Sequence, residues 1–183
     1  MALTRLGGAN AITGVIPLAN GGTGATSFTE GIKGFDSWRL TADVAGTNAD
    51  VTLTSNLARN NDSYFSKIGT GMSESSGVFS FPQTGLYLVQ FFVRIRFDTS
   101  ADNCFVRIEL TSDNGSNYTN ESFTLVSGAT GEQESGFGQV AFNVTDTSTH
   151  KTKFTVGSLN TNNDILGDAD YNQTYFNFIR IGD

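Results

Sequence analysis

Cysteine, proline and long apolar runs are almost absent from this chain of 183 residues. The single cysteine, Cys104, excludes an internal disulfide, so the fold does not depend on an oxidising compartment. No stretch approaches the roughly 20 apolar residues that a membrane-spanning helix needs, and the N-terminus lacks a charged segment leading into an apolar one. We therefore expect neither a membrane anchor nor a signal peptide.

Basic residues are also few: 11 Lys and Arg stand against 18 Asp and Glu, which leaves a net charge of -7. They form no basic stripe that could neutralise a phosphate backbone. Nucleic acid is therefore not an expected partner, and neither is the interior of a membrane.

Residues 35–183 have the composition and periodicity of an all-β domain. Glycine (21) and phenylalanine (15) are plentiful, a mixture that favours strands joined by tight turns. Trp38 and Leu40 alternate with polar residues, as do Val51 and Leu53, which predicts half-buried strands. Further strands are expected near residues 63–69, 77–81, 85–97, 104–112, 120–127, 137–145, 152–158 and 171–181. About ten antiparallel strands, each with one apolar face, predict a jelly-roll sandwich.

Residues 1–34 have a different character, because glycine interrupts every apolar run. Such a segment is either a disordered tail in the free monomer or a stalk that orders against other copies or a larger assembly. Its remaining apolar residues favour docking, since a solvated linker would not need them. The expected docking residues are Ile12, Val15, Ile16 and Leu18.

The stretch GLYLVQFFVRIRF, residues 85–97, departs from simple alternation. Its odd positions are apolar throughout from Tyr87, whereas its even positions begin apolar and end basic. One face fills the sandwich, so the apolar part of the other face needs a second cover. A neighbouring subunit is the simplest cover, and the N-terminal segment of the same chain is the alternative. The residues expected at a trimer interface are Leu86, Leu88 and Phe92.

Phe79, Gly85, Tyr87 and Phe91 reproduce a known spacing, in which an aromatic residue, a glycine six positions later and alternating aromatics mark a middle strand. The stretch resembles the central signature of the complement C-one-q globular head and the related tumour-necrosis-factor jelly roll. The ending TYFNFIRIG, residues 174–182, is similar to that family's last strand. The resemblance covers about residues 36–183 and implies a ten-stranded jelly roll that assembles as a compact trimer.

Three positions depart from the family's pattern. Val89 stands where an aromatic residue is usual. Lys67 replaces an expected acidic or amide residue, and Met72 replaces an expected aromatic residue. The upstream half of the signature is therefore poor, and the resemblance is specific mainly over residues 79–91.

The stretch ITGVIPLANGGTGATS, residues 12–27, is rich in small residues and glycine. It is similar to a segment that recurs in fibre and other virion proteins of tailed bacteriophages, usually before a folded knob or between shaft units. Small residues let three backbones approach a common axis, and glycine permits unusual backbone angles. The resemblance implies a virion protein that assembles in the host cytoplasm.

Motifs for catalysis are weak or missing, and we expect no catalytic residues and no cofactor. Residues 21–27 lack the lysine and the flanking strand and helix of a phosphate-binding loop. Cys104 alternates inward with apolar residues, which predicts a buried structural thiol. His150 is the only histidine and has no partners for a catalytic triad.

Carboxylates offer two weaker candidates. The acidic loop at residues 163–172 supplies oxygen ligands but lacks the spacing of an EF-hand, so a solvated turn is expected and a calcium site is the alternative. Glu132 and Glu134 are predicted to lie in a glycine-flanked turn, which does not suit a glycosidase pair. Six Asn-x-Ser/Thr matches are expected by chance in a surface rich in these residues.

These observations predict a non-enzymatic bacteriophage virion protein: an N-terminal stalk (1–34) and a jelly-roll knob (35–183), as a homotrimer. It would serve as a short tail fibre or receptor-binding knob, with the N-terminal segment held by other virion proteins. Loops at 113–120, 128–136 and 160–172 would contact a host-surface glycan or protein. The alternative is a capsid decoration or cement protein; a virion-associated glycan hydrolase is a third hypothesis.

Overall fold

Residues 31–182 form an all-β fold in the computed structural model, which describes this part of the chain. Thirteen strands make two antiparallel sheets. The seven-stranded sheet contains β1 (Gly34–Leu40), β2 (Val44–Ala45), β4 (Leu57–Arg59), β7 (Gly85–Phe97), β10 (Glu132–Val144), β12 (Asn163–Ile165) and β13 (Tyr175–Gly182). The six-stranded sheet contains β3 (Ala49–Thr52), β5 (Ser73–Ser75), β6 (Val78–Ser80), β8 (Asp102–Thr111), β9 (Thr119–Gly128) and β11 (Lys151–Leu159).

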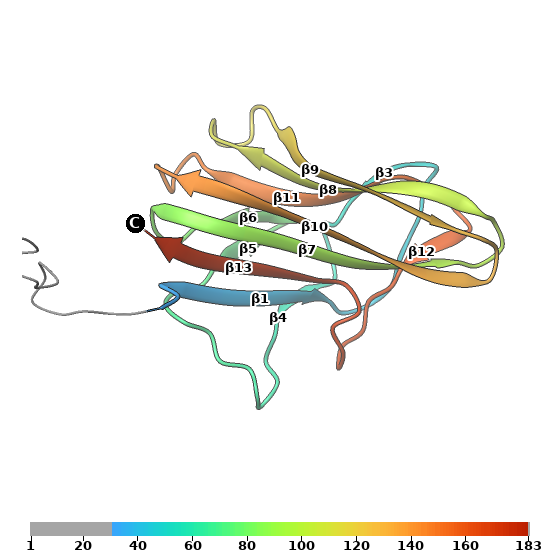
Figure 1. The fold of residues 1–183 in the computed structure, drawn as a ribbon, viewed down its shortest axis with the longest axis horizontal. Helices are drawn as coiled ribbons and strands as arrows, with labels where there is room; N and C mark the ends of the chain where they lie inside the picture. Colours follow the sequence, from blue (N-terminus) through green and yellow to red (C-terminus); the bar gives the residue numbers. More distant parts are fainter. Residues whose placement is uncertain (1–30, 183) are drawn as a thin grey trace, which may run out of the picture. The chain divides into compact units, whose positions relative to one another are not determined.

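Strand β7 is the centre of the seven-stranded sheet. It pairs with β10 along its whole length on one side, and with β13 and then β12 on the other. Beyond β13 the sheet continues through β1 to β4, and these ribbons lie side by side in Figure 1. The other sheet has the order β5-β6-β11-β8-β9, with β3 beside β11. This arrangement confirms the predicted jelly-roll sandwich.

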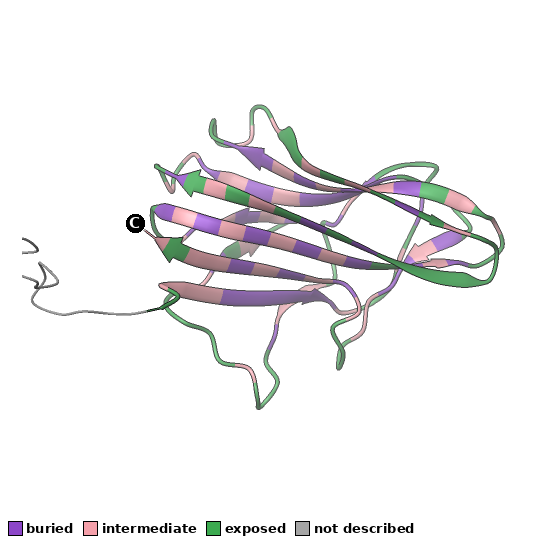
Figure 2. Ribbon diagram, viewed as in Figure 1, coloured by how far each residue is buried: buried purple, intermediate pink, exposed green. Residues whose placement is uncertain are grey.

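The core forms where the inner faces of the two sheets meet. Purple and pink bands alternate along β7 in Figure 2, because its odd residues are buried and its even residues are mostly half-buried. Phe91 and Phe176 pack from the seven-stranded sheet against Phe154 of β11, whose ring centroid lies 4.4 Å from that of Phe176. Burial of such rings supplies the main apolar stabilisation of the fold.

The predicted strand at residues 63–69 is wrong. These residues belong to a loop between β4 and β5, and only Ile68 forms an isolated bridge, with Phe35. Tyr64 in this segment is fully exposed, so its apolar residues do not share one buried face. Three of the short strands, β2, β4 and β5, have only two or three residues, too few to show a period of two.

The N-terminal half of β10 also differs from expectation. The sequence predicts a turn at Glu132 and Glu134, whereas β10 already begins at Glu132. The hairpin with β7 extends this strand: Glu132 pairs with Phe97, and Gly131 makes the turn with a φ of +86°. Backbone pairing over 13 residues therefore outweighs the weak strand propensity of Gly and Glu here.

The sequence predicts a division after residue 34. In the structure β1 begins at Gly34, and the compact unit that contains the sandwich begins at Ile32. Residues 1–30 lie outside the described part of the chain. The predicted stalk and its docking residues Ile12, Val15, Ile16 and Leu18 therefore stay a prediction. No helix among residues 31–182 is long and apolar enough to cross a membrane.

Cys104 is fully buried on β8, as its position in the alternation predicts. Burial, with a smaller contribution from the charge of Asp102, raises the pKa of the Cys104 thiol to about 12.

We expect the native protein at pH 8 to be inert to a thiol-specific chromogenic reagent and to react fully once it is unfolded. A Ser112→Cys variant, with a thiol at an exposed position, should react at once. Rapid reaction of Cys104 in the native state would contradict this burial.

Candidate interaction surface on the outer face of the seven-stranded sheet

The outer face of the seven-stranded sheet carries the even residues of β7. Strand register places those from Leu86 to Phe92 in rows that cross β10, β7 and β13, since directly opposed residues of antiparallel strands point to the same side. Three consecutive rows differ in chemistry.

The first of these rows is apolar across the whole sheet, and we call it the apolar row. Leu88 is its centre, paired with Ala141 of β10 and Ile179 of β13. It continues through Phe35 of β1 to Ile68, which forms the isolated bridge to Phe35. Ile68 is 46% exposed, so one end of the row is open to solvent.

The next row consists of amides. Asn177 donates through Nδ2 to Gln90 Oε1 (3.3 Å), and Gln90 donates through Nε2 to Gln139 Oε1 (3.5 Å). These bonds hold the three side chains against the sheet. The row is polar, but many of its amide groups already have hydrogen-bond partners within one chain.

The third row is aromatic. Phe92 of β7 lies between Phe137 of β10 and Tyr175 of β13, and the rings of Phe92 and Tyr175 stack at 5.0 Å. Phe137 is 45% exposed. Arg94 follows two positions after Phe92 and is exposed, which ends the apolar surface at this level.

The sequence predicted Leu86, Leu88 and Phe92 for this surface, and the structure places all three half-buried on one face of β7. Their place in an interface stays a prediction. The sequence missed their neighbours in the rows, chiefly Phe137 and Tyr175. Alternation within each strand would have assigned these residues to a face, but only the register between strands shows that they join Phe92.

A second apolar surface lies on the outer face of the six-stranded sheet, where Phe123 of β9 stacks on Phe105 of β8 with ring centroids 4.7 Å apart. Phe123 and Leu125 of β9 are 57% and 56% exposed.

At the neighbouring edge, β10 of one sheet approaches β9 of the other. The approach depends on glycine, since a Cβ at Gly138 would lie 2.6 Å from Ser122 Oγ. Thr124 Oγ1 donates to the Phe137 carbonyl oxygen (2.9 Å) and links the two edges.

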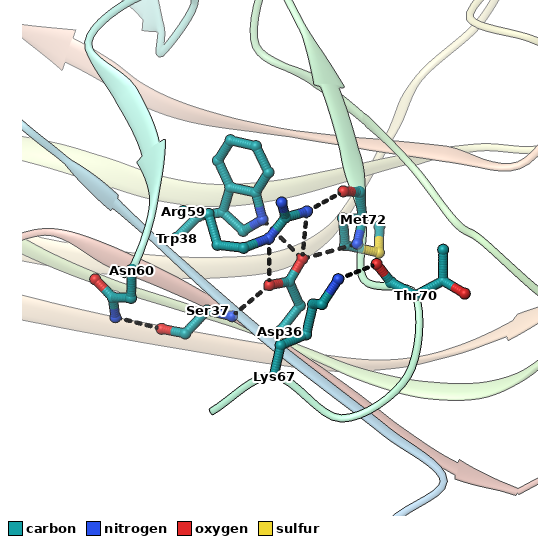
Figure 3. Close-up of polar contacts among 8 residues, drawn as sticks. All are labelled: Asp36, Ser37, Trp38, Arg59, Asn60, Lys67, Thr70 and Met72. Carbon is teal, nitrogen blue, oxygen red and sulfur yellow. Dashed lines mark hydrogen bonds and ion pairs between the residues drawn. The ribbon is translucent and has the colours of Figure 1, made fainter. Parts of the chain in front are cut away.

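A buried carboxylate anchors the opposite edge, as Figure 3 shows. Asp36 of β1 is 2% exposed and accepts hydrogen bonds from Arg59 Nε (2.8 Å), Trp38 Nε1 (2.9 Å) and the Met72 backbone N (2.7 Å). Arg59 also lies over the Trp38 ring, 4.7 Å from its centroid. One acidic side chain therefore joins β1 to both ends of the loop between β4 and β5.

This loop packs over the outer side of β1. Arg39 Nη1 lies 3.1 Å from Asp62 Oδ2, and Asn60 Nδ2 donates to Ser37 Oγ (2.9 Å). A Cβ at Gly71 would lie 2.8 Å from Asp36 Oδ2, and Gly71 has a φ of +78°, so only glycine suits the return of the chain. These contacts fix the position of Ile68 at the end of the apolar row.

The residues considered for catalysis do not converge. His150 is buried, with its ring nitrogens 3.1 Å and 3.4 Å from the hydroxyls of Thr149 and Thr145. Glu132 and Glu134 are exposed at the beginning of β10, and Glu132 accepts a hydrogen bond from the Ala129 backbone N.

The acidic loop at 163–172 includes β12, so it is only partly a turn. Asp164 pairs with Arg96, and Asp168 Oδ1 accepts hydrogen bonds from the backbone N of Asp170 and Tyr171. Within residues 31–182 no group of three or more His, Cys, Asp or Glu could hold a metal ion. The carboxylates are instead used by the protein itself.

The other predicted loops are shorter than expected. Residues 128–136 contain the hairpin turn and the first part of β10, and β9 begins at Thr119 within the 113–120 segment. Hydrogen bonds from the Thr111 hydroxyl and from Asn117 lower the pKa of Asp113 to about 2. The Asp113 carboxylate thereby organises a compact turn.

Comparison with known proteins identifies the fold. No family model matches the chain, and no curated protein matches its sequence. Crystal structures of murine APRIL at pH 8.5 and pH 5.0 are similar, each with a TM-score of 0.58 and with 9% and 10% sequence identity. Each match covers 81% of this chain and 98% of the other. These neighbours have the tumour-necrosis-factor jelly roll, which confirms the fold implied by residues 79–91.

We expect Asp36→Ala to lower the free energy of unfolding by roughly 3 kcal/mol, because it leaves Arg59 Nε and the buried backbone N–H of Met72 without their acceptor. The matched control is Asp98→Ala, which removes a 49% exposed partner of Arg96, while Asp43 and Asp164 remain. That control should lose less than about 1 kcal/mol. Urea unfolding measures both values, and equal losses would contradict the anchoring role of Asp36.

Proposed function

We propose that this protein is a non-enzymatic structural protein of a bacteriophage virion, working as a homotrimeric short fibre or receptor-binding knob. The observation that carries the proposal is the partly open apolar face of β7, where the apolar and aromatic rows lie in parallel. Exposed apolar side chains grouped on one face of a sheet are typical of protein interfaces.

Further copies of the same chain suit this face better than a foreign partner. Each chain carries a second apolar surface, on the outer face of the six-stranded sheet, in Phe123 and Leu125 of its edge strand β9. Two different apolar surfaces on the same chain allow a heterologous contact, and repeated rotation closes such contacts into a ring. The jelly-roll family that residues 79–91 resemble implies three copies.

Adhesion follows from the number of copies. Three identical loop sets would engage repeated groups on a host surface, so weak single contacts add up through effective concentration. Exposed tyrosines at positions 64 and 171, with 100% and 71% of their surface open, lie in loops suited to such contacts. The virion assignment itself is supported by the resemblance of residues 12–27 to phage fibre segments.

Phe92→Arg should convert the trimer to a monomer. It places a guanidinium among the stacked rings of the aromatic row, and three such charges would face one another in the assembly. Light scattering on a sizing column should change from about 58 kDa, three chains of 19.5 kDa, to a single chain.

Tyr64→Arg makes the same type of change at a fully exposed loop position and serves as the control. It should leave the mass unchanged. A wild-type monomer, or a Phe92→Arg protein that remains trimeric, would overturn the proposed interface.

The position of the protein in the virion tests its assignment as a tail fibre. Antibody raised against residues 35–183 should label purified virions at the tail. Label spread over the head would replace the fibre by a capsid decoration protein, and absence of label from purified virions would reject the virion assignment. Release of products from host polysaccharide, lost on changing Glu132 or Glu134, would favour the glycan hydrolase instead.

A further inference from the structure

A groove opens on the flank of the sandwich, where β9 and β10 are the edge strands of their sheets. It has a volume of about 320 Å³, which is within the range of small-molecule sites. The strands β8, β9 and β10 and the beginning of the loop after β8 supply its lining: Leu110, Thr111, Ser112, Thr119, Glu121, Val140, Ala141 and Phe142.

The sequence of β10 explains why the groove forms at this point. Successive positions on the inner side of the strand are Gly136, Gly138, Val140 and Phe142. β9 lies close to the glycines, since a Cβ at Gly136 would be 2.5 Å from Val126 Cγ2. Val140 and Phe142 carry bulky side chains on the same side of β10. β9 cannot keep its short distance there, and the two edges separate.

The apolar wall of the groove is fixed by contacts within the chain. The ring of Phe142 packs against Phe81, with centroids 5.5 Å apart, and against His150, with centroids 5.3 Å apart. Val140 is half-buried and packs against the core. A wall held in this way does not have to reorganise when a ligand binds, which lowers the cost of binding.

A β-bulge brings the one charged residue of the lining to the groove. On β9, Ser122 pairs with Ile108. The next pair joins Asn120 to Glu109, so Glu121 is an extra residue between the two pairs. A bulge of this kind redirects a side chain. In a regular ladder Glu121 would stand opposite Glu109, whereas here it lines the groove.

The charges at the groove favour a cation. The lining contains no Lys, Arg or His, and Glu121 takes part in no ion pair within residues 31–182. Asp113 directly follows Ser112, and its pKa of about 2 keeps it charged at neutral pH. The hydroxyls of Ser112 and Thr119 add hydrogen-bond acceptors to the lining. Carboxylates without a neighbouring cation attract a positively charged group.

We propose that this groove binds an organic ammonium ion. The apolar body of the ligand lies against Leu110, Val140 and Phe142, and its head group donates hydrogen bonds to the Glu121 carboxylate. A phenylalkyl amine has this chemistry. The inference does not depend on the proposed trimer, because one chain supplies the whole lining.

Three probes with the same phenylbutyl body test the proposal on the full chain. Phenylbutylamine is a cation at pH 7, phenylbutanol is neutral and phenylbutyrate is an anion. Saturation-transfer NMR titrations should show that the amine binds about fivefold more tightly than the alcohol, and that the anion binds most weakly. Equal affinities for the three probes, or no binding of the amine, would overturn the proposal.

A charge reversal assigns the selectivity to one residue. Glu121→Lys should invert the order, so that phenylbutyrate binds more tightly than phenylbutylamine. Glu134→Lys makes the same change at an exposed position near the other end of β10 and should keep the order of the native protein. An order that Glu121→Lys leaves unchanged would overturn the role of Glu121.

A bulky substitution tests the apolar part of the site. Thr119→Trp adds an indole at an exposed position of the lining and should weaken the binding of the amine and the alcohol alike, by about fivefold or more. Thr161→Trp, in an exposed loop outside the groove, is the control and should bind both probes as the native protein does. Unchanged binding by Thr119→Trp would place the probes elsewhere and overturn the proposal.

Discussion

Strand β7 is apolar along the whole of one face and at Leu86, Leu88 and Phe92 of the other, and a two-layer sandwich can bury only one face. Its odd residues, from Tyr87 to Phe97, are buried against the opposite sheet. Its even residues remain half open, and the register of β10 and β13 extends that open surface into rows. The apolar row ends at one edge in Ile68, which is 46% exposed.

Whether the sequence predicts a feature of this surface depends on how far apart in the chain the interacting residues lie. The two faces of β7 are predictable, because alternation is local and the strand is 13 residues long. The aromatic row is not predictable in this way, since Phe137 and Tyr175 lie 45 and 83 positions from Phe92 and only strand register joins them. The same limit explains β10, whose first residues are extended by pairing with β7.

The anchored loop shows a second limit. Residues 63–69 have enough apolar side chains to suggest a strand, yet the loop is held by Asp36, a carboxylate 36 positions before Met72. No local pattern reports that a single buried acid gathers Arg59, Trp38 and Met72. This acid holds both ends of the loop that carries Ile68, so the stability of the loop depends on one residue.

Solvent exposure of the tyrosines in solution tests the central claim most directly. Tyr175 lies in the aromatic row, whereas Tyr64 and Tyr171 lie in exposed loops. Hydroxyl-radical labelling read by mass spectrometry compares residues of one chemical type in one molecule. The account predicts strong oxidation of Tyr64 and Tyr171 and almost none of Tyr175 in the native protein. Oxidation of Tyr175 in proportion to its half-open surface in the single chain would show that no copy covers β7, and would contradict the account.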